Sequence, residues 1–151
     1  MTKNISKSFS LIEVLVFISI LSILFVAAAS TTIFALRNMK INEHKILATY
    51  YGEELLGWLT GEKENDWNSF LLQSDTFPLY KVYCFKETPI SDWGSNNSCL
   101  ADDWLSAIYK RELYLSKNDD SSQVNVRIVV SWTELEVNYS VPLSTVFTIW
   151  E

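Results

Sequence analysis

Residues 8–36 read SFSLIEVLVFISILSILFVAAASTTIFAL. From Val14 to Leu36 the run has 23 residues without a formal charge, and most of them are Val, Ile, Leu, Phe or Ala. As an α-helix this run would be about 35 Å long, enough to cross a hydrocarbon core of about 30 Å. The pattern therefore predicts a membrane-spanning helix ahead of a more polar domain that begins at Arg37.

Glu13 stands at the head of the apolar run and separates three interpretations of the N-terminus. A secretory signal peptide would be cut within Ala27–Ala29, but the apolar run continues past that point to Leu36. A plain membrane anchor explains the length and leaves the carboxylate without a purpose, although an ionised carboxylate in a spanning helix costs roughly 2.5–3.5 kcal/mol. The third interpretation has to give Glu13 a role.

That role comes from a resemblance. Residues 8–15, Ser-Phe-Ser-Leu-Ile-Glu-Val-Leu, resemble the cleavage and methylation motif of type IV prepilins and type II secretion pseudopilins. The resemblance implies a prepilin leader, residues 1–8, that prepilin peptidase removes by cutting between Ser8 and Phe9. It also implies N-methylation of Phe9 and makes Glu13 the fifth mature residue. Ser8 departs from the family, which usually has Gly there, and the absence of proline from the membrane half favours a minor pilin or minor pseudopilin.

The resemblance also implies a location and partners. Residues 9–36 would anchor the chain in the bacterial inner (cytoplasmic) membrane as a single pass, with the C-terminal domain outside the cytoplasm. The same helix would then pack in the core of a cell-surface or periplasmic filament. The partners would be other pilin or pseudopilin subunits, prepilin peptidase, the inner-membrane assembly platform and membrane lipid. In the filament Glu13 would neutralise a neighbour's N-terminal amine, and such a buried pair sets register more than it adds stability.

Residues 37–151 have the composition of one soluble domain. The whole chain is 48% hydrophobic and 14% aromatic with only 4 Gly and 3 Pro, which excludes a disordered protein. The soluble part carries 10 basic and 17 acidic side chains, a net charge of −7. A surface of this charge repels a phosphate backbone, so no direct contact with nucleic acid is expected.

Hydrophobic periodicity predicts the fold of this domain. Apolar residues recur from Ile41 through Leu47 to Trp58, so the N-terminal helix should continue to about residue 60 and stop at Gly61. A short helix is expected within 66–72, and Pro142 should end a strand. The sheet should span about 79–150, with strands at 79–86, 111–116, 124–132, 135–141 and 143–150 and a tight turn at Thr133–Glu134. A long N-terminal helix packed on a small antiparallel sheet is an α+β, pilin-like plan.

Two cysteines, Cys84 and Cys99, lie 15 residues apart in the soluble part. Outside the cytoplasm a disulfide between them is the default expectation, and two free buried thiols are the alternative. Trp93 and Trp104 bracket Cys99. If exposed, these rings could anchor a partner, because aromatic residues often carry interface energy, and the competing interpretation is that they pack under the loop.

No pattern in the sequence indicates an enzyme. A nucleophilic triad needs a base beside a Ser or Cys, and the only histidine, His44, falls in a charged helical stretch where a solvated side chain is expected. Asp119–Asp120 is typical of a turn and falls short of the roughly six to eight oxygen ligands of calcium. No cofactor and no metal are expected. The sequence favours a structural, minor subunit of a type IV pilus or pseudopilus, with a pilus-borne binding module for adhesion, DNA uptake or secreted-substrate contact as the alternative.

Overall fold

The computed structural model describes residues 10–96, 99–106 and 108–149, which divide into two compact units, Met1–Asn42 and Glu43–Glu151. Helix α1 (Leu11–Asn65) contributes to both units. Its end at Asn65 lies beyond the predicted end near residue 60, and Gly61 does not stop it. Lys63 explains the extension, because its side chain is buried and its ammonium lies 5.4 Å from the centre of the Phe147 ring. This packing outweighs the helix penalty of one glycine, about 1 kcal/mol.

In the first unit, every described residue from Ser10 to Lys40 is exposed. The polar side chains within the apolar run are satisfied by the helix itself. Five hydroxyl groups donate to carbonyl oxygens three or four residues earlier at 2.8–2.9 Å: Ser19, Ser22, Ser30, Thr31 and Thr32. The helix can therefore lie in an apolar medium without leaving these hydroxyl donors unsatisfied.

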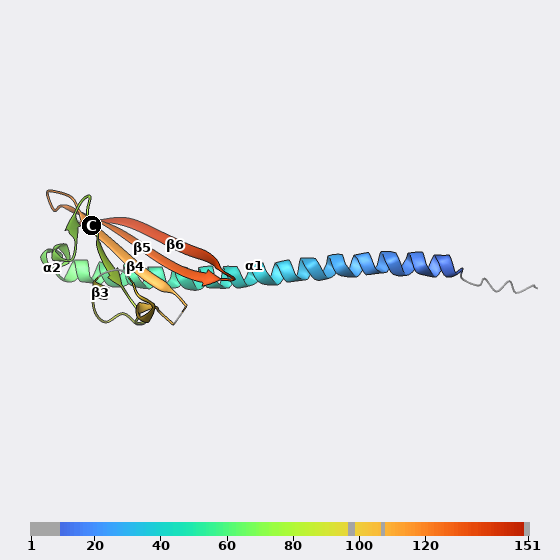
Figure 1. Ribbon diagram of the computed structural model, residues 1–151. Helices are drawn as coiled ribbons and strands as arrows, with labels where there is room; N and C mark the ends of the chain where they lie inside the picture. Colours follow the sequence, from blue (N-terminus) through green and yellow to red (C-terminus); the bar gives the residue numbers. More distant parts are fainter. Residues whose placement is uncertain (1–9, 97–98, 107, 150–151) are drawn as a thin grey trace, which may run out of the picture. The chain divides into compact units, whose positions relative to one another are not determined.

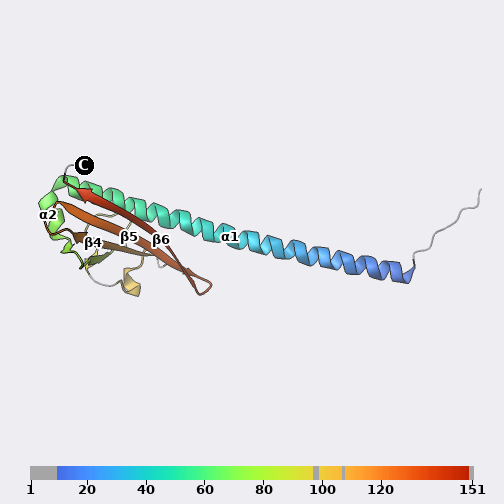
Figure 2. The same cartoon turned by 90° about the horizontal axis from the view of Figure 1, so that it is seen from above.

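The second unit is built on a six-stranded sheet with the order β3-β2-β4-β5-β6. Its strands are β1 (Asp75–Thr76), β2 (Lys81–Cys84), β3 (Ser95–Asn96), β4 (Lys110–Lys117), β5 (Gln123–Glu134) and β6 (Val137–Thr148). The pairings are antiparallel except for β1, which runs parallel to β4. A short helix α2 (Trp67–Leu72) and a 3-10 turn η1 (Ala101–Asp103) complete the unit. Figure 1 and Figure 2 show β4, β5 and β6 side by side along the part of α1 that belongs to this unit.

The core lies between this part of α1 and the inner face of the sheet. The predicted alternation in β5 is confirmed: its buried residues are Val124, Val126, Ile128, Val130 and Trp132. On α1 the buried positions before Lys63 are Ala48, Gly52, Leu55 and Leu59. Leu47, which belongs to the apolar recurrence that predicted this part of the helix, is 38% exposed. Gly52 brings the two layers close, because a Cβ there would lie 2.5 Å from Leu143 Cδ1.

Two predictions at the β5–β6 hairpin are wrong. The tight turn is Leu135–Glu136 and not Thr133–Glu134, because Glu134 still pairs with Val137. Leu135 and Glu136 have φ values of 49° and 65°, the pattern of a type I′ hairpin turn that matches the twist of its strands. Pro142 does not end a strand, since it lies inside β6 and faces Val129. β6 is an edge strand, where a residue without an N–H is tolerated.

The segment before β2 follows the prediction of a short helix. Asp66 caps α2, since its carboxylate accepts from the backbone N–H groups of Asn68 (3.0 Å) and Ser69 (3.3 Å). The Ser69 hydroxyl also donates to it at 2.5 Å. These bonds, led by that of the Ser69 hydroxyl, favour the carboxylate and lower the pKa of Asp66 below its ordinary value of 3.8.

Candidate functional site

Glu13 occupies the first turn of α1, where a negative side chain interacts favourably with the helix dipole. Its N–H donates to Ser10 O at 3.0 Å, and its side chain is exposed. Within the part of the chain that the structure describes, no salt bridge to Glu13 is formed. The helix that follows is long and apolar enough to cross a membrane, and none of its most apolar stretch is buried. The predicted cleavage site, Ser8 and Phe9, lies outside the described residues.

The Cys84 and Cys99 sulfurs are joined in a disulfide, with Cα atoms 5.5 Å apart. Cys84 is buried at the end of β2. The chain between them returns to β2 at Gly94, where a Cβ would lie only 1.9 Å from Cys84 O. A side chain at Gly94 would therefore collide with backbone, so this close approach requires glycine. The loop is held at two points, by the disulfide and by the contact at Gly94.

Trp93 and Trp104 have different surroundings. Trp93 is half-buried, and its Nε1 donates to Glu62 Oε2 at 3.1 Å. Its ring centre lies 5.1 Å from that of Trp58 and 5.2 Å from that of Tyr83, so it belongs to an aromatic cluster between α1 and β2. Trp104, in contrast, is 36% exposed. Of the two rings predicted as partner contacts, Trp104 is thus the more exposed.

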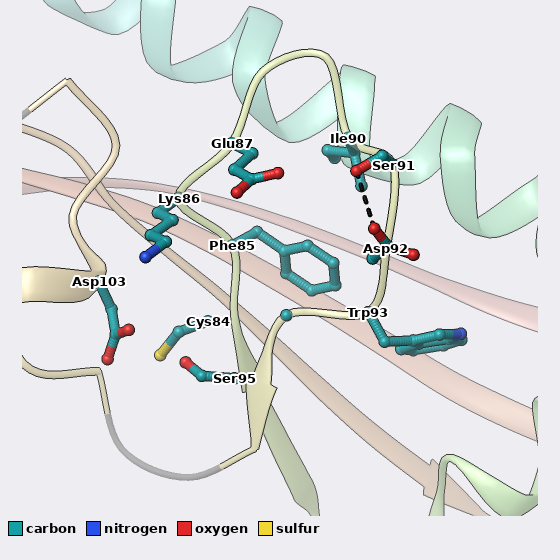
Figure 3. Close-up of a pocket in the computed structure, with 11 residues that line it drawn as sticks. Cys84, Phe85, Lys86, Glu87, Ile90, Ser91, Asp92, Trp93, Ser95 and Asp103 are labelled. Carbon is teal, nitrogen blue, oxygen red and sulfur yellow. Dashed lines mark hydrogen bonds between the residues drawn. The ribbon is translucent and has the colours of Figure 1, made fainter.

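A cavity of about 200 Å³ lies inside the loop that follows β2 (Figure 3). Phe85 and Trp93 contribute its aromatic lining, and three carboxylates, Glu87, Asp92 and Asp103, line it as well. The Ser91 hydroxyl donates to Asp92 at 3.0 Å. Among the described residues no group of three or more His, Cys, Asp or Glu side chains could hold a metal ion.

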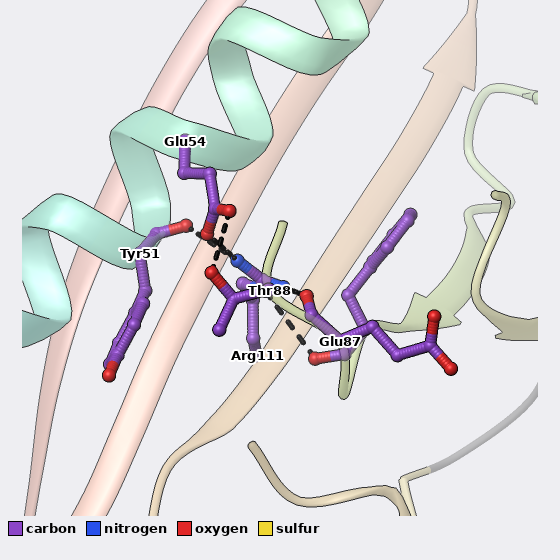
Figure 4. Close-up of polar contacts among 6 residues, drawn as sticks. Tyr51, Glu54, Glu87, Thr88 and Arg111 are labelled. Carbon is purple, nitrogen blue, oxygen red and sulfur yellow. Dashed lines mark hydrogen bonds and ion pairs between the residues drawn. The ribbon is translucent and has the colours of Figure 1, made fainter. Parts of the chain in front are cut away.

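Arg111 is a fully buried cation that the sequence analysis missed (Figure 4). Its Nη1 donates to Glu54 Oε2 at 2.8 Å and to Tyr51 O at 3.2 Å. Its other nitrogens donate to Phe85 O and Glu87 O, and the Thr88 hydroxyl donates to Glu54 Oε1 at 2.8 Å. Burial lowers the pKa of Arg111, and the hydrogen bond with Glu54 opposes that shift. The guanidinium therefore ties α1 to the start of the disulfide loop. The sequence does contain a signal for this buried cation, because Arg111 shares the strand face of the apolar residues Leu113 and Leu115.

His44 is not the solvated side chain that the sequence predicted. Its Nδ1 lies 2.6 Å from Tyr109 Oη, and its Nε2 lies 3.4 Å from Glu134 Oε2. The ring centre is also 6.1 Å from that of Trp132. Burial raises the pKa of Tyr109, with smaller contributions from nearby charged and ionisable groups that include Glu134. The cluster joins α1 to the tip of the β5–β6 hairpin, which is a packing role.

Comparison with known proteins bears on the N-terminal segment. Residues 3–29 match the family model described as the prokaryotic N-terminal methylation motif. No curated protein and no solved structure matches the chain. The motif points to a structural protein that assembles with other pilin subunits and is a substrate of prepilin peptidase. An exposed apolar helix with Glu13 in its first turn, a disulfide and a helix packed on an antiparallel sheet agree with it. The chain thus carries the N-terminal methylation motif characteristic of type IV pilins and pseudopilins, ahead of a pilin-like α+β domain.

Proposed function

We propose that the chain is a minor structural subunit of a type IV pilus or of a type II secretion-like pseudopilus. The observation that carries this proposal is the bare apolar helix of the first unit, in which every described residue from Ser10 to Lys40 is exposed. So much apolar surface needs lipid before assembly and other helices afterwards. The small residues Ala27–Ala29 and the internally bonded hydroxyl groups permit close approach between such helices.

Processing would create a partner for Glu13, which forms no salt bridge within the described residues. Cleavage between Ser8 and Phe9 gives a cationic amine, which is then methylated on Phe9. In a staggered assembly, Glu13 of one subunit faces this amine of a neighbour. Because charges are costly in an apolar seam, only the register that pairs them is favoured. Glu13 therefore acts in this proposal as a register-setting residue and not as a catalytic one.

The compartment is inferred from the cysteines. Disulfides persist outside the reducing cytoplasm, so the Cys84–Cys99 bond supports a second unit on the far side of the inner membrane. The chain would be a single-pass inner-membrane protein before it joins a surface or periplasmic filament, with the assembly platform as a further partner. Its net charge of −7 beyond residue 36 opposes direct nucleic-acid contact.

Two measurements test the proposal. Mass spectrometry of the cellular protein should find a methylated N-terminus at Phe9, and a chain that begins at Met1 or after Ala29 would refute the processing step. Replacing Glu13 with Ala should deplete the chain from sheared filaments while leaving its membrane level and processing unchanged. Glu53→Ala is the matched control, because Glu53 is an exposed acid on the same helix in the second unit. Equal filament content for the two variants would contradict the role of Glu13.

A pilus-borne binding module is the second candidate, and the exposure of Trp104 favours it. Leu100 and Ile108, which flank Trp104 in sequence, are 68% and 45% exposed. Trp104→Ala should then abolish adhesion, uptake or substrate contact while filaments persist. Trp93→Ala is a poorer probe, because Trp93 packs in the aromatic cluster and its loss would disturb folding.

A further inference from the structure

The outer edge of β6 is open. β6 is the last strand of the six-stranded sheet, and no described strand pairs with its outer side (Figure 1). Residues 137–149 contain no charged side chain. Edge strands are usually protected from further pairing by charged residues, bulges or proline. Of these protecting features, β6 has only Pro142. Residues 143–148 are therefore an unprotected edge.

We propose that residues 143–148 of β6 bind an extended, uncharged segment of another polypeptide, which adds a strand to the sheet and inserts a small apolar side chain beside α1. This inference goes beyond the filament role, because it concerns only the second unit and does not depend on the apolar part of α1 that belongs to the first unit.

The register shows which backbone groups are free to bind. The two-residue turn makes Glu134 and Val137 the closing pair of the hairpin, and alternate pairs from there exchange hydrogen bonds. Val129 and Pro142 then form a pair that exchanges none, so the position of Pro142 faces outward and its missing N–H costs the ladder nothing. By the same alternation, the N–H and C=O groups of Ser144 and Val146 point away from β5. These groups can bond an incoming strand.

A cavity beside this half of β6 can select which side chain of an added strand fits there. About 70 Å³ of space is lined by Leu56 of α1, by Val126 and Ile128 of β5, and by residues 143–145 of β6. One turn earlier, Gly52 and Leu143 bring helix and strand into contact, so the space opens only from Leu56 onward. Leu56, Leu143 and Thr145 are half-buried and form part of its wall. A side chain from an added strand can complete this wall, as in other strand-addition sites, which use pockets for alternate residues.

The chemistry of the occupant follows from these features. The cavity wall is mainly aliphatic and its volume is small, so it suits Ala or Val and excludes an aromatic side chain. A charge placed there would be desolvated without a partner. The neighbouring outward side chains, Ser144 and Val146, are also uncharged. An extended segment that alternates small apolar and hydroxyl residues therefore fits both faces of the edge.

The experiment follows amide hydrogen exchange by NMR in the full chain in detergent micelles, with the peptide acetyl-STVTVTS-amide as probe. At millimolar peptide, exchange of the Ser144 and Val146 amides should slow by about tenfold. Leu143 and Thr145 should not change, because the register already directs their N–H groups to β5. Peptides with Ser or with Trp in place of both Val residues should protect these amides much less.

Two proline variants provide the matched pair. Ser144→Pro removes one outward donor from the proposed edge, whereas Ser140→Pro removes an outward donor of the same register on the other side of Pro142. Protection by the Val peptide should be lost in the first and kept in the second. Should Ser144→Pro fail to fold, the comparison of the Val, Ser and Trp peptides on the wild-type chain tests the proposal instead. The inference is overturned if the Val peptide does not protect the Ser144 and Val146 amides in alternation with Leu143 and Thr145, or if the Ser or Trp peptide protects them equally well. It is also overturned if these amides become protected without peptide as protein concentration rises, because the occupant would then be a second copy of the chain.

Discussion

Replacing Glu54 with Ala should destabilise the second unit strongly, because it leaves Arg111 charged and buried without its carboxylate. Arg111 has no exposed side-chain surface, and the Glu54 side chain is 16% exposed. Removing one partner of a buried pair costs about 3–5 kcal/mol. Three backbone carbonyls, those of Tyr51, Phe85 and Glu87, still accept from Arg111 in the variant. We therefore expect the lower end of that range, about 3 kcal/mol.

Lys110 offers a matched control one residue away. Its Nζ lies 2.8 Å from Glu112 Oε1, the same distance as in the Arg111–Glu54 pair. The two carboxylates are similarly buried, at 12% exposed for Glu112 and 16% for Glu54, but the Lys110 side chain is 32% exposed and solvent screens its charge. A solvent-screened pair contributes about 1 kcal/mol or less. At about 4 °C per kcal/mol for a unit of this size, Glu54→Ala should lower Tm by about 12 °C and Lys110→Ala by less than about 4 °C.

Thermal unfolding followed by near-UV circular dichroism measures both variants, because the buried Trp132 reports on tertiary packing. Glu54→Gln keeps an acceptor for Arg111 while removing the charge, and its Tm should fall between those of wild type and Glu54→Ala. The reasoning is refuted if Glu54→Ala and Lys110→Ala shift Tm equally, since burial would then not decide the strength of the pair.

Other predictions concern the disulfide loop and the cap of α2. Gly94→Ala should destabilise the second unit by about 1–3 kcal/mol in chemical denaturation, because its Cβ would meet Cys84 O at 1.9 Å, whereas Gly57→Ala, with open space around its Cβ, should stabilise by up to about 1 kcal/mol. A smaller effect at Gly94 than at Gly57 would contradict the close approach. Cys99→Ser should lower the unfolding free energy by roughly 3 kcal/mol, the loop-closure value for 15 residues, and reducing agent should then have no further effect. The pKa of Asp66 is lower in the folded state, so its stabilisation is present above about pH 3.8 and is lost as pH falls through the folded pKa. Exchange of the Ser69 amide should accelerate over that acid range in wild type and not in Asp66→Asn.

Features that depend on neighbouring residues could be predicted from the sequence. The alternation from Val124 to Trp132 emerged as the buried face of β5, because side chains in a strand alternate between two faces. Asp66 precedes a short apolar stretch and caps α2. The Cys84–Cys99 disulfide is the default expectation for two cysteines in a domain outside the cytoplasm, and the structure forms it in place of two free thiols.

Errors arose where a distant contact overrode a local preference. Gly61 did not end α1, because Lys63 packs against Phe147, which lies near the end of β6 and far from Lys63 in the sequence. Pro142 did not end β6, because the sheet topology makes that strand an edge. His44 is held by Tyr109 and Glu134, which lie far from it in the chain. No window of sequence around these residues contains the partners that decide their state.

The sequence by itself determined the N-terminal chemistry of this protein: an apolar helix, a carboxylate at its head and the methylation motif at residues 3–29. A linear segment suffices there, because length and apolar composition decide how a helix partitions into lipid. Only the tertiary structure decided the burial of Arg111, the open edge of β6 and the cavity beside Leu56. These features depend on which strands pair and how closely α1 packs on them. Such contacts join residues far apart in the sequence, so no local periodic pattern predicts them.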